Sequence, residues 1–596
     1  MLISIKPCYF CLAVLFALTL ISTATAQSTA PTAKWSTTRY GKHASNTVEF
    51  FHGTYTRLNN GTVIATGSRY LNGDDALRSS VEIYDPVTGT WNDADPMHFP
   101  RTNHDALLLA DGRLLVIGGV KPSSPAPIEY AGPPEIYDPA TGKWTVLNLT
   151  GVDLSNRYGL IPFIASHFLL PSGKVLIIGG FGRVETFFLD PNTGHIVEGP
   201  KYLQQNGAGF VRSPDNSAAI LFNGSLLLRT SKRLFTFDPD DLLLNELPTP
   251  KVGDSSPDFV ISTILPTGEA FSILTSFTGV QEPILNYYHG IFDGNLWKDI
   301  AQRNFGDPGN SLTASVPLTS GTEVLTIQSG VPTLYNTITK TARLTDYSPS
   351  RLYTPVLLAD GRVLAGESIY GIDFGVTPTI TSTTSASYRV EPLARNSIAS
   401  VFGSGIGGHA ITIKGSDGVQ YNVPTVFADT PNQINFLIPE TVPYGQAEMT
   451  VGNQKGLLSI TDVSPGIFTA NANGRGAPAA VLLRVKGDGT QIYEPVVEFN
   501  PATGSFDPIA IDQGSEADQL ILVLFGTGMK NNVSTEKTIA YIGDRRARVQ
   551  YIGAQGDFLG LDQVNLILPK GLSSSTYTVR LTVNGKTANE VIIRLK

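Results

Sequence analysis

The sequence predicts an all-β protein built largely from one repeated unit, and three observations lead to this prediction. Glycine and proline are frequent among the 596 residues, and no long stretch shows the 3.6-residue period of an amphipathic helix. Short apolar runs are instead separated by turn residues, as in residues 107–119, LLLADGRLLVIGG. The same pattern returns along most of the first 370 residues.

The first half of the unit is a hairpin of two apolar strands around a turn that ends in glycine. Asn-Gly and Asp-Gly pairs between apolar runs indicate hairpins, because both central residues need positive φ. Their spacing averages about 50 residues. The seven turns are Asn60-Gly61, Asp111-Gly112, Ser172-Gly173, Asn223-Gly224, Thr267-Gly268, Ser320-Gly321 and Asp360-Gly361.

The second half of the unit is a strand ending at Asp-Pro, a turn and a further strand, as in residues 134–144, PEIYDPATGKW. Proline lacks an amide proton and sets a turn, so Asp-Pro ends the strand. Two hairpins make a four-stranded sheet, which must stack on its neighbours to bury both faces. The motif recurs, with increasing divergence, at residues 81–91, 184–196, 234–244, 283–297 and 332–344.

The segments GRLLVIGG (112–119) and YDPATGKW (137–144) resemble a kelch repeat, and the resemblance implies a kelch-like β-propeller over residues 27–370. The seventh hairpin, residues 352–367, has no Asp-Pro motif after it. AKWS at 33–36 is similar to GKWT at 142–145, so we expect residues 34–38 to complete the seventh blade. The alternative is a six-bladed ring with a disordered N-terminus.

Residues 371–394 are rich in Thr and Ser and are expected to form a linker. A second internal repeat follows, in which residues 397–408 correspond to 520–531 and residues 430–453 to 560–585. The density of short strands predicts two Ig-like β-sandwich domains, at 395–470 and 471–596. Through SPGIF (464–468) and residues 551–569, this half resembles the tandem Ig-like, IPT/TIG-related segments of secreted bacterial proteins, particularly the Solibacter-type C-terminal domain. The predicted fold is thus a seven-bladed kelch-like β-propeller followed by two Ig-like β-sandwich domains.

Residues 1–26 have the features of a signal peptide: Lys6, an apolar core over residues 10–21, and Ala24-Thr25-Ala26 before the expected mature start at Gln27. An uncleaved membrane anchor is the alternative. Cleavage would leave no membrane-spanning segment, and it would place the protein outside the cell or at its surface, or in a periplasm. Both cysteines, Cys8 and Cys11, lie in this segment, so the mature chain would have neither disulfides nor thiolate ligands.

The formal net charge of −8 argues against nucleic acid as a partner. We expect a monomer, and no sequence motif indicates a metal or another cofactor. A kelch propeller followed by an Ig-like domain also resembles galactose oxidase and its copper-radical relatives. That resemblance implies a cysteine cross-linked to a copper-ligating tyrosine, and the lack of a mature cysteine leads us to reject this mechanism. No catalytic residue is assigned, because no hydrolase, metalloprotease or phosphate-loop motif occurs.

Arginine and histidine recur near the start of the first strand of several predicted blades. The innermost strands of a propeller line its channel, so these cations could ring one mouth and bind an anionic or polyhydroxyl ligand. The alternative is that they pair with carbonyls and acids to hold loops in place. The candidate residues are Arg39, His43, Arg101, His104, Arg157, His167, Arg212 and Arg351.

The sequence therefore predicts a secreted, non-enzymatic binding or adhesion protein. Its propeller would bind an extracellular glycan or protein, with the Ig-like domains as spacer or anchor; this step rests on fold-level analogy. The alternative is an extracellular carbohydrate-active hydrolase or lyase with its site at the propeller mouth. A structural envelope protein is a third possibility.

Overall fold

A computed structural model gives the structure of the chain, and the described part is all-β, as the sequence predicts. It contains no α-helix and one 3₁₀ turn, η3 (Thr535–Lys537). Residues 1–31, which include the expected signal peptide, lie outside the described part. The described residues are 32–38, 53–67, 79–121, 129–152, 166–178, 186–200, 219–229, 234–248, 258–265, 267–278, 284–292, 297–303, 313–328, 331–345, 355–366, 368–424, 426–531 and 533–596.

Seven separate sheets, each built on a four-stranded antiparallel meander, occupy the described residues from 33 to 372. Each follows the predicted order of a hairpin, a third strand and an outer strand, and the third strand is followed by an Asp-Pro step in the first four sheets. The first three are β2 (Thr54–Arg57), β3 (Val63–Thr66), β4 (Val81–Asp85) and β5 (Thr90–Ala94); β6 (Thr102–Leu108), β7 (Leu114–Lys121), β9 (Glu135–Asp138) and β10 (Lys143–Val146), with β8 (Glu129–Tyr130); and β12 (Ser166–Leu169), β13 (Val175–Ile178), β14 (Thr186–Leu189) and β15 (His195–Glu198), with β11 (Thr150–Gly151).

The other four sheets follow the same meander. They are β16 (Ala219–Ile220), β17 (Leu226–Arg229), β18 (Leu234–Asp238) and β19 (Leu243–Leu247); β20 (Asp258–Ile264), β21 (Ala270–Thr278), β22 (Ile284–Phe292) and β23 (Trp297–Arg303); β24 (Thr313–Pro317), β25 (Glu323–Gln328), β26 (Val331–Asn336) and β27 (Thr341–Leu344); and β28 (Pro355–Leu357), β29 (Val363–Ala365), β30 (Ser368–Ile372) and β1 (Ala33–Thr37).

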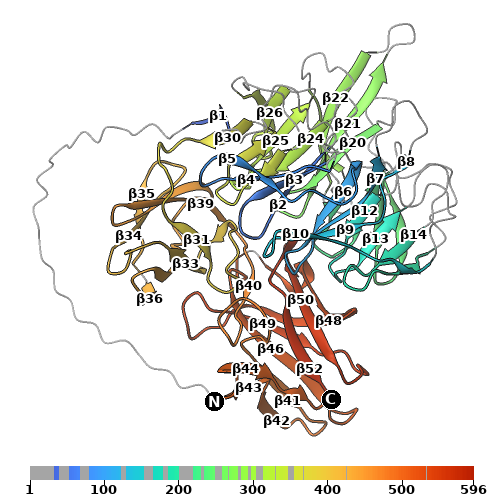
Figure 1. Cartoon of the computed structure of the whole chain (residues 1–596), viewed down its shortest axis with the longest axis vertical. Coiled ribbons are helices and arrows are strands. Elements are labelled where there is room, and N and C mark those ends of the chain that lie inside the picture. Colours follow the sequence, from blue (N-terminus) through green and yellow to red (C-terminus); the bar gives the residue numbers. More distant parts are fainter. Residues whose placement is uncertain are drawn as a thin grey trace, which may run out of the picture.

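The last of these sheets takes its outer strand from the N-terminus, as the motif at Trp35 indicates. β1 pairs antiparallel with β30, and Trp35 lies opposite Tyr370 (Figure 1). The first strands of neighbouring sheets touch, including β28 with β2, so the last sheet packs against the first. Apolar side chains from adjacent sheets form the cores between them, for example Val63, Leu358 and Leu364. This arrangement is a propeller-type fold.

All four tryptophans of the chain lie on outer strands and make the same contact between blades. Each stacks at 5.1–5.4 Å on an aromatic ring of its own sheet. Each indole N–H is donated to the residue that directly follows the outer strand of the preceding blade. The pairs are Trp35 with Thr345 Oγ1, Trp91 with Thr38 Oγ1, Trp144 with the Asp95 carbonyl and Trp297 with the Pro248 carbonyl.

Residues 373–462 form a two-sheet sandwich around a single apolar core that includes Val401, Phe436 and Met449. The expectation of a linker over 371–394 is wrong in part, because Thr381–Thr384 form β31 and pair with β33 inside this sandwich. The strands are β31, β33 (Ile398–Phe402), β37 (Gln433–Leu437) and β36 (Val426–Asp429) in one sheet, and β32 (Leu393–Ala394), β39 (Gln454–Thr461), β38 (Gly445–Val451), β34 (Ile411–Lys414) and β35 (Gln420–Asn422) in the other.

The second sandwich is one long sheet folded around its own core. Val463 and Ile467 belong to this core, so the boundary lies near residue 462, before the expected 470. The strands are β40 (Gly466–Ile467), β41 (Ala480–Val485), β42 (Gln491–Pro495), β45 (Ala510–Ile511), β46 (Gln519–Thr527), β47 (Thr538–Ile542), β48 (Arg545–Ala554), β49 (Asp562–Ile567), β50 (Thr576–Val583), β51 (Lys586–Thr587) and β52 (Val591–Leu595), with a separate hairpin of β43 (Val497–Asn500) and β44 (Ser505–Pro508).

The internal repeat is visible in side-chain geometry as well as in sequence. The Gln433 side-chain amide donates to Asn435 Oδ1 at 2.9 Å, and that of Gln563 donates to Asn565 Oδ1 at 2.7 Å. The first pair lies on β37, which pairs antiparallel with β33, and the second lies on β49, which pairs antiparallel with β46. The two copies of the repeat therefore share the same side-chain hydrogen bond. No helix in the described part of the chain is long and apolar enough to cross a membrane.

Candidate functional site

The meander gives the propeller two unlike faces. The glycine turns and the turns after Asp-Pro lie at the same ends of their strands, and we call this the turn face. The connections into the next blade and the middle turn of each meander lie at the other ends, on what we call the loop face. The two sandwiches lie against the propeller in Figure 1, and their contacts are with the turn face.

Polar contacts dock the sandwiches on the turn face. Arg389 of the first sandwich donates to the carbonyls of Ala110 in the propeller, at 2.7 Å, and Thr587 in the second sandwich, at 3.0 Å, so one guanidinium joins three domains. Ser459 Oγ donates to Thr319 Oγ1 at 2.7 Å. Asp240, in the turn after β18, accepts from Arg546 at 3.1 Å and from the Tyr541 hydroxyl, both in the second sandwich.

On the loop face, residues 95–101, which lead from the first blade into the second, are held by a buried carboxylate. Glu135 accepts from Arg101 Nη2 at 3.1 Å and from the backbone amides of His98, at 2.7 Å, and Phe99, at 3.1 Å. His98 Nδ1 lies 2.8 Å from the same carboxylate. Arg101 also donates to the carbonyls of Gly118 and Pro133. Its side chain is fully buried, and burial lowers its pKa while Glu135 opposes that shift.

The predicted residues His104 and His167 also lie in buried polar pairs between blades. His104 Nε2 lies 2.9 Å from Thr66 Oγ1 and 3.3 Å from Thr54 Oγ1, both in the first blade. His167 Nδ1 lies 2.5 Å from Asp105 Oδ2 and links the third blade to the second. His167 Nε2 is buried and forms no hydrogen bond within the described residues. The other predicted residues, Arg39, His43, Arg157, Arg212 and Arg351, lie outside the described part of the chain.

Sequence reasoning missed the two acids, Glu135 and Asp105, that hold these predicted cations. A signal for Glu135 was present, because the second residue of three successive Asp-Pro motifs is a glutamate, as Glu82, Glu135 and Glu185. Asp105 directly follows His104, but nothing in the sequence places it beside His167, which is 62 positions away. Among the described residues, no group of three or more His, Cys, Asp or Glu side chains could hold a metal ion.

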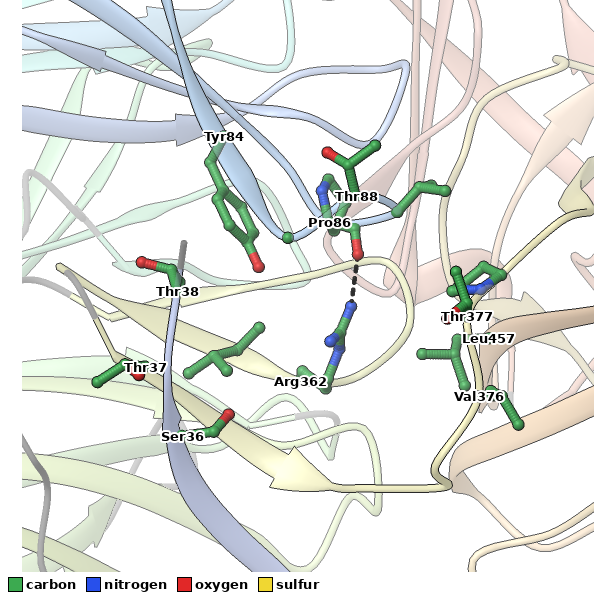
Figure 2. A pocket seen from close by; sticks show the side chains of 14 residues that line it. Ser36, Thr37, Thr38, Tyr84, Pro86, Thr88, Arg362, Val376, Thr377 and Leu457 are labelled. Atoms are coloured by element: carbon green, nitrogen blue, oxygen red, sulfur yellow. Dashed lines mark hydrogen bonds between the residues drawn. The ribbon is translucent and has the colours of Figure 1, made fainter. Parts of the chain in front are cut away.

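Two grooves open where the turn face meets the sandwiches. The first, of about 340 Å³, lies between β1, the turn after β4 and the first sandwich, and Tyr84, Arg362 and Thr377 line it (Figure 2). The second, of about 410 Å³, lies between the third blade and the second sandwich, with Phe188, Arg580 and Tyr577 in its lining. Both volumes fall within the range of small-molecule sites, about 300–1,000 Å³.

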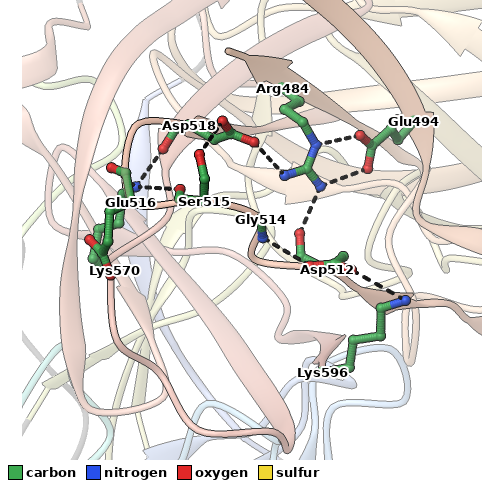
Figure 3. A network of polar contacts seen from close by, with 9 residues as sticks. All are labelled: Arg484, Glu494, Asp512, Gly514, Ser515, Glu516, Asp518, Lys570 and Lys596. Carbon is green, nitrogen blue, oxygen red and sulfur yellow. Dashed lines mark hydrogen bonds and ion pairs between the residues drawn. The ribbon is translucent and has the colours of Figure 1, made fainter. Parts of the chain in front are cut away.

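A dense ionic network in the second sandwich has a structural role (Figure 3). Arg484, on β41, donates to both oxygens of Glu494 at 2.5 and 3.0 Å, to Asp518 at 3.3 Å and to the Asp512 carbonyl at 2.7 Å. The hydrogen bond to Glu494 is the largest cause of the raised pKa of Arg484. These acceptors take four of the five guanidinium N–H groups, so the network ties β41 and β42 to residues 512–518.

Comparison with known proteins supports the kelch resemblance over a short stretch. The chain is 38% identical over 98 residues to an F-box/kelch-repeat protein of Arabidopsis thaliana and 35% identical over 72 residues to the Kelch-like protein terF of Aspergillus terreus. These matches cover 16% and 12% of this chain and 27% and 16% of the relatives, so the chain spans less than a third of either relative. No family model matches the chain.

Two solved structures are similar at low identity. A fungal alcohol oxidase of the AA5 family, in complex with copper, has 15% identity and a TM-score of 0.41 over 72% of this chain and all of its own. A protein described as YjhT has 15% identity and a TM-score of 0.34 over 50% of this chain and 94% of its own. Together, the short kelch matches and the meander sheets support a kelch-like propeller fold.

Proposed function

We propose that the chain is an exported binding protein without catalytic activity of its own, which presents the loop face of its propeller to an extracellular glycan or protein. The observation that carries the proposal is the pairing of Glu135. This carboxylate contacts four donors and thereby holds residues 95–101 in one conformation. A preorganised loop with internally satisfied charges favours recognition over proton transfer.

The sandwiches support this role as a rigid base. They cover the turn face through bonds such as those of Arg389, so a partner of the propeller has the loop face and the blade edges to bind. The short matches to kelch-repeat proteins favour a propeller that acts as an interaction platform. Export is inferred from the signal-peptide features of residues 1–26.

The test is a binding screen with residues 27–596, immobilised through the second sandwich and probed with a glycan array and extracellular protein fractions. His98, whose side chain is 52% exposed on the loop face, is the residue to vary. We expect His98→Ala to weaken binding of the identified ligand about fivefold, and His409→Ala, on the exposed surface of the first sandwich, to leave it unchanged. Equal binding by all three proteins would contradict recognition through the loop face.

The Asp105–His167 pair favours one second candidate, an extracellular carbohydrate-active hydrolase or lyase. A carboxylate at 2.5 Å from Nδ1 orients an imidazole as it would for a general base, and Nε2 has no partner within the described residues. The check is hydrolysis of a panel of polysaccharides by the mature chain and by His167→Asn. Activity lost in His167→Asn would replace the binding proposal, and no activity in either protein would leave it standing.

A further inference from the structure

The groove of Figure 2 is assembled from four segments that are distant in sequence. β1 contributes Ser36 and Thr37, the turn after β4 contributes residues 86–89, and the seventh blade contributes Arg362 and Ile369. Residues 376–378 and Leu457 of the first sandwich form the remaining wall. The groove therefore exists only when β1 closes the last blade and the sandwich is docked.

Two donors face this groove without an internal acceptor. Tyr84 is 1% exposed, and its hydroxyl forms no hydrogen bond within the part of the chain that the structure describes. Arg362 uses Nε and Nη2 on Asp360, at 2.9 and 2.6 Å, and Nη2 also reaches the Pro86 carbonyl at 2.8 Å. Its Nη1 forms no hydrogen bond among the described residues. Figure 2 shows the Tyr84 hydroxyl and the guanidinium directed into the same space.

The Tyr84 hydroxyl opens onto the groove, so an acceptor on a ligand can form a hydrogen bond with it. Burial raises the pKa of Tyr84 to about 12, so the hydroxyl keeps its proton and stays a donor at neutral pH. Around it, the hydroxyls of Ser36, Thr37 and Thr377 can donate or accept, and Val376 and Leu457 give an aliphatic wall. Such a lining suits a ligand with many hydroxyl groups and apolar C–H faces.

The charges nearby favour a neutral ligand over an anion. The Arg362 guanidinium is the charged group in the lining, and Asp360 already pairs with it. Asp373 also acts on Arg362, and Asp85 on Tyr84, through their charges. The two carboxylates that act on this one guanidinium, Asp360 and Asp373, disfavour a further negative charge.

We propose that this groove binds a neutral saccharide unit of one or two rings, with Tyr84 Oη and Arg362 Nη1 as donors to its oxygens. The volume of about 340 Å³, at the lower end for ligand sites, fits that size. The groove is separate from the loop face, so sugar binding here can be tested independently of the function proposed above.

The test is saturation-transfer NMR and calorimetry on the mature chain with glucose, galactose, mannose, N-acetylglucosamine, maltose and cellobiose, with glucuronate as an anionic counterpart. We expect saturable binding of at least one neutral sugar and weaker binding of glucuronate. Tyr84→Phe, which keeps the ring, should weaken binding about fivefold through loss of one hydrogen bond. Thermal melting of Tyr84→Phe would confirm that the fold is retained.

Two valines with similar exposure, one in each groove, allow one variant that should block sugar binding and one control variant. Val87, 42% exposed, lines this groove, and Val197, 43% exposed, lines the second one. Val87→Trp should abolish sugar binding, while Val197→Trp should leave it unchanged. The proposal is overturned if no sugar in the panel binds saturably, if Tyr84→Phe binds as the unaltered chain does, or if Val197→Trp is the variant that blocks binding. Failure here would leave the effect of His98→Ala on the loop-face ligand untouched.

Discussion

Trp91 of the first blade donates its indole N–H to the Thr38 hydroxyl over 3.3 Å, which joins the first blade to the strand that completes the last one. Trp35, on that strand, makes the equivalent bond to Thr345 of the sixth blade at 2.8 Å. The N-terminal segment therefore links three blades. Since a closed ring leaves no sheet edge between its ends, these two bonds hold the ring shut.

Replacing Trp35 should open this closure. The side chain is partly buried, so Trp35→Ala is expected to cost about 2–3 kcal/mol, less than the 3–5 kcal/mol of a fully buried aromatic. Urea unfolding gives the free energy directly. Tyr493→Ala, at a tyrosine that is 67% exposed, is the control and should change it by less than about 0.5 kcal/mol. Equal stability of the two variants would show that β1 does not hold the ring.

The buried pair of Arg101 and Glu135 should be sensitive to loss of one charge. Glu135→Gln leaves the guanidinium without its counter-charge and is expected to cost about 3–5 kcal/mol. A double-mutant cycle with Arg101→Met should show the double variant to be more stable than the sum of the single effects predicts. The exposed pair of Lys143 and Asp95 is the comparison, where Asp95→Asn should cost under about 1 kcal/mol. Additive effects at Arg101 and Glu135 would mean that the two charges are not coupled.

Asp562 predicts a pH dependence of stability. Its carboxyl group is buried, and burial raises its pKa to about 6 from 3.8, so the folded state holds the proton more tightly than the unfolded chain. The stability from this group is complete below pH ~4 and is lost as the pH rises through ~6. The loss corresponds to about 3 kcal/mol.

Asp562→Asn should remove this dependence, because an amide oxygen can still accept from the Met529 amide but cannot ionise. Relative to the unaltered chain, the variant should gain stability between pH 4 and 7, as measured by chemical unfolding at several pH values. Asp544→Asn, whose side chain is 66% exposed, should leave the profile unchanged. Parallel pH profiles for Asp562→Asn and the unaltered chain would refute the buried-proton explanation.

Local sequence signals predicted the propeller, including the strand at Trp35, because turns and alternation are encoded within a few residues. The segment 379–387, which contains β31, was predicted to be part of a linker because most of its side chains carry hydroxyl groups, so buried and exposed positions do not differ in hydropathy. Thr384 is fully buried and bonded to the Ser387 hydroxyl, and Ser385 donates to the Ile398 carbonyl. A pattern based on hydropathy does not distinguish such a strand from a linker.

The sites were less accessible to prediction because they depend on contacts between distant segments. Arg101 and His104 lie at the entry to the second blade, but their partners Glu135 and Thr66 come from strands elsewhere in the chain. The groove at Tyr84 requires β1, the turn after β4 and the first sandwich to meet. The local sequence pattern does not predict this contact, because the contact depends on how whole domains pack against one another.

The docking of the sandwiches on the turn face is the central claim, and one engineered disulfide tests it most directly. The mature chain would have no cysteine of its own, so Thr319→Cys with Ser459→Cys introduces a single pair, at hydroxyls that lie 2.7 Å apart. The control combines Thr319→Cys with Ser505→Cys in β44, at the far end of the second sandwich (Figure 1). Under mild oxidation, intact-mass measurement should show the disulfide in most molecules of the first variant and in few of the control. A first variant that stays as reduced as the control would contradict the docked arrangement.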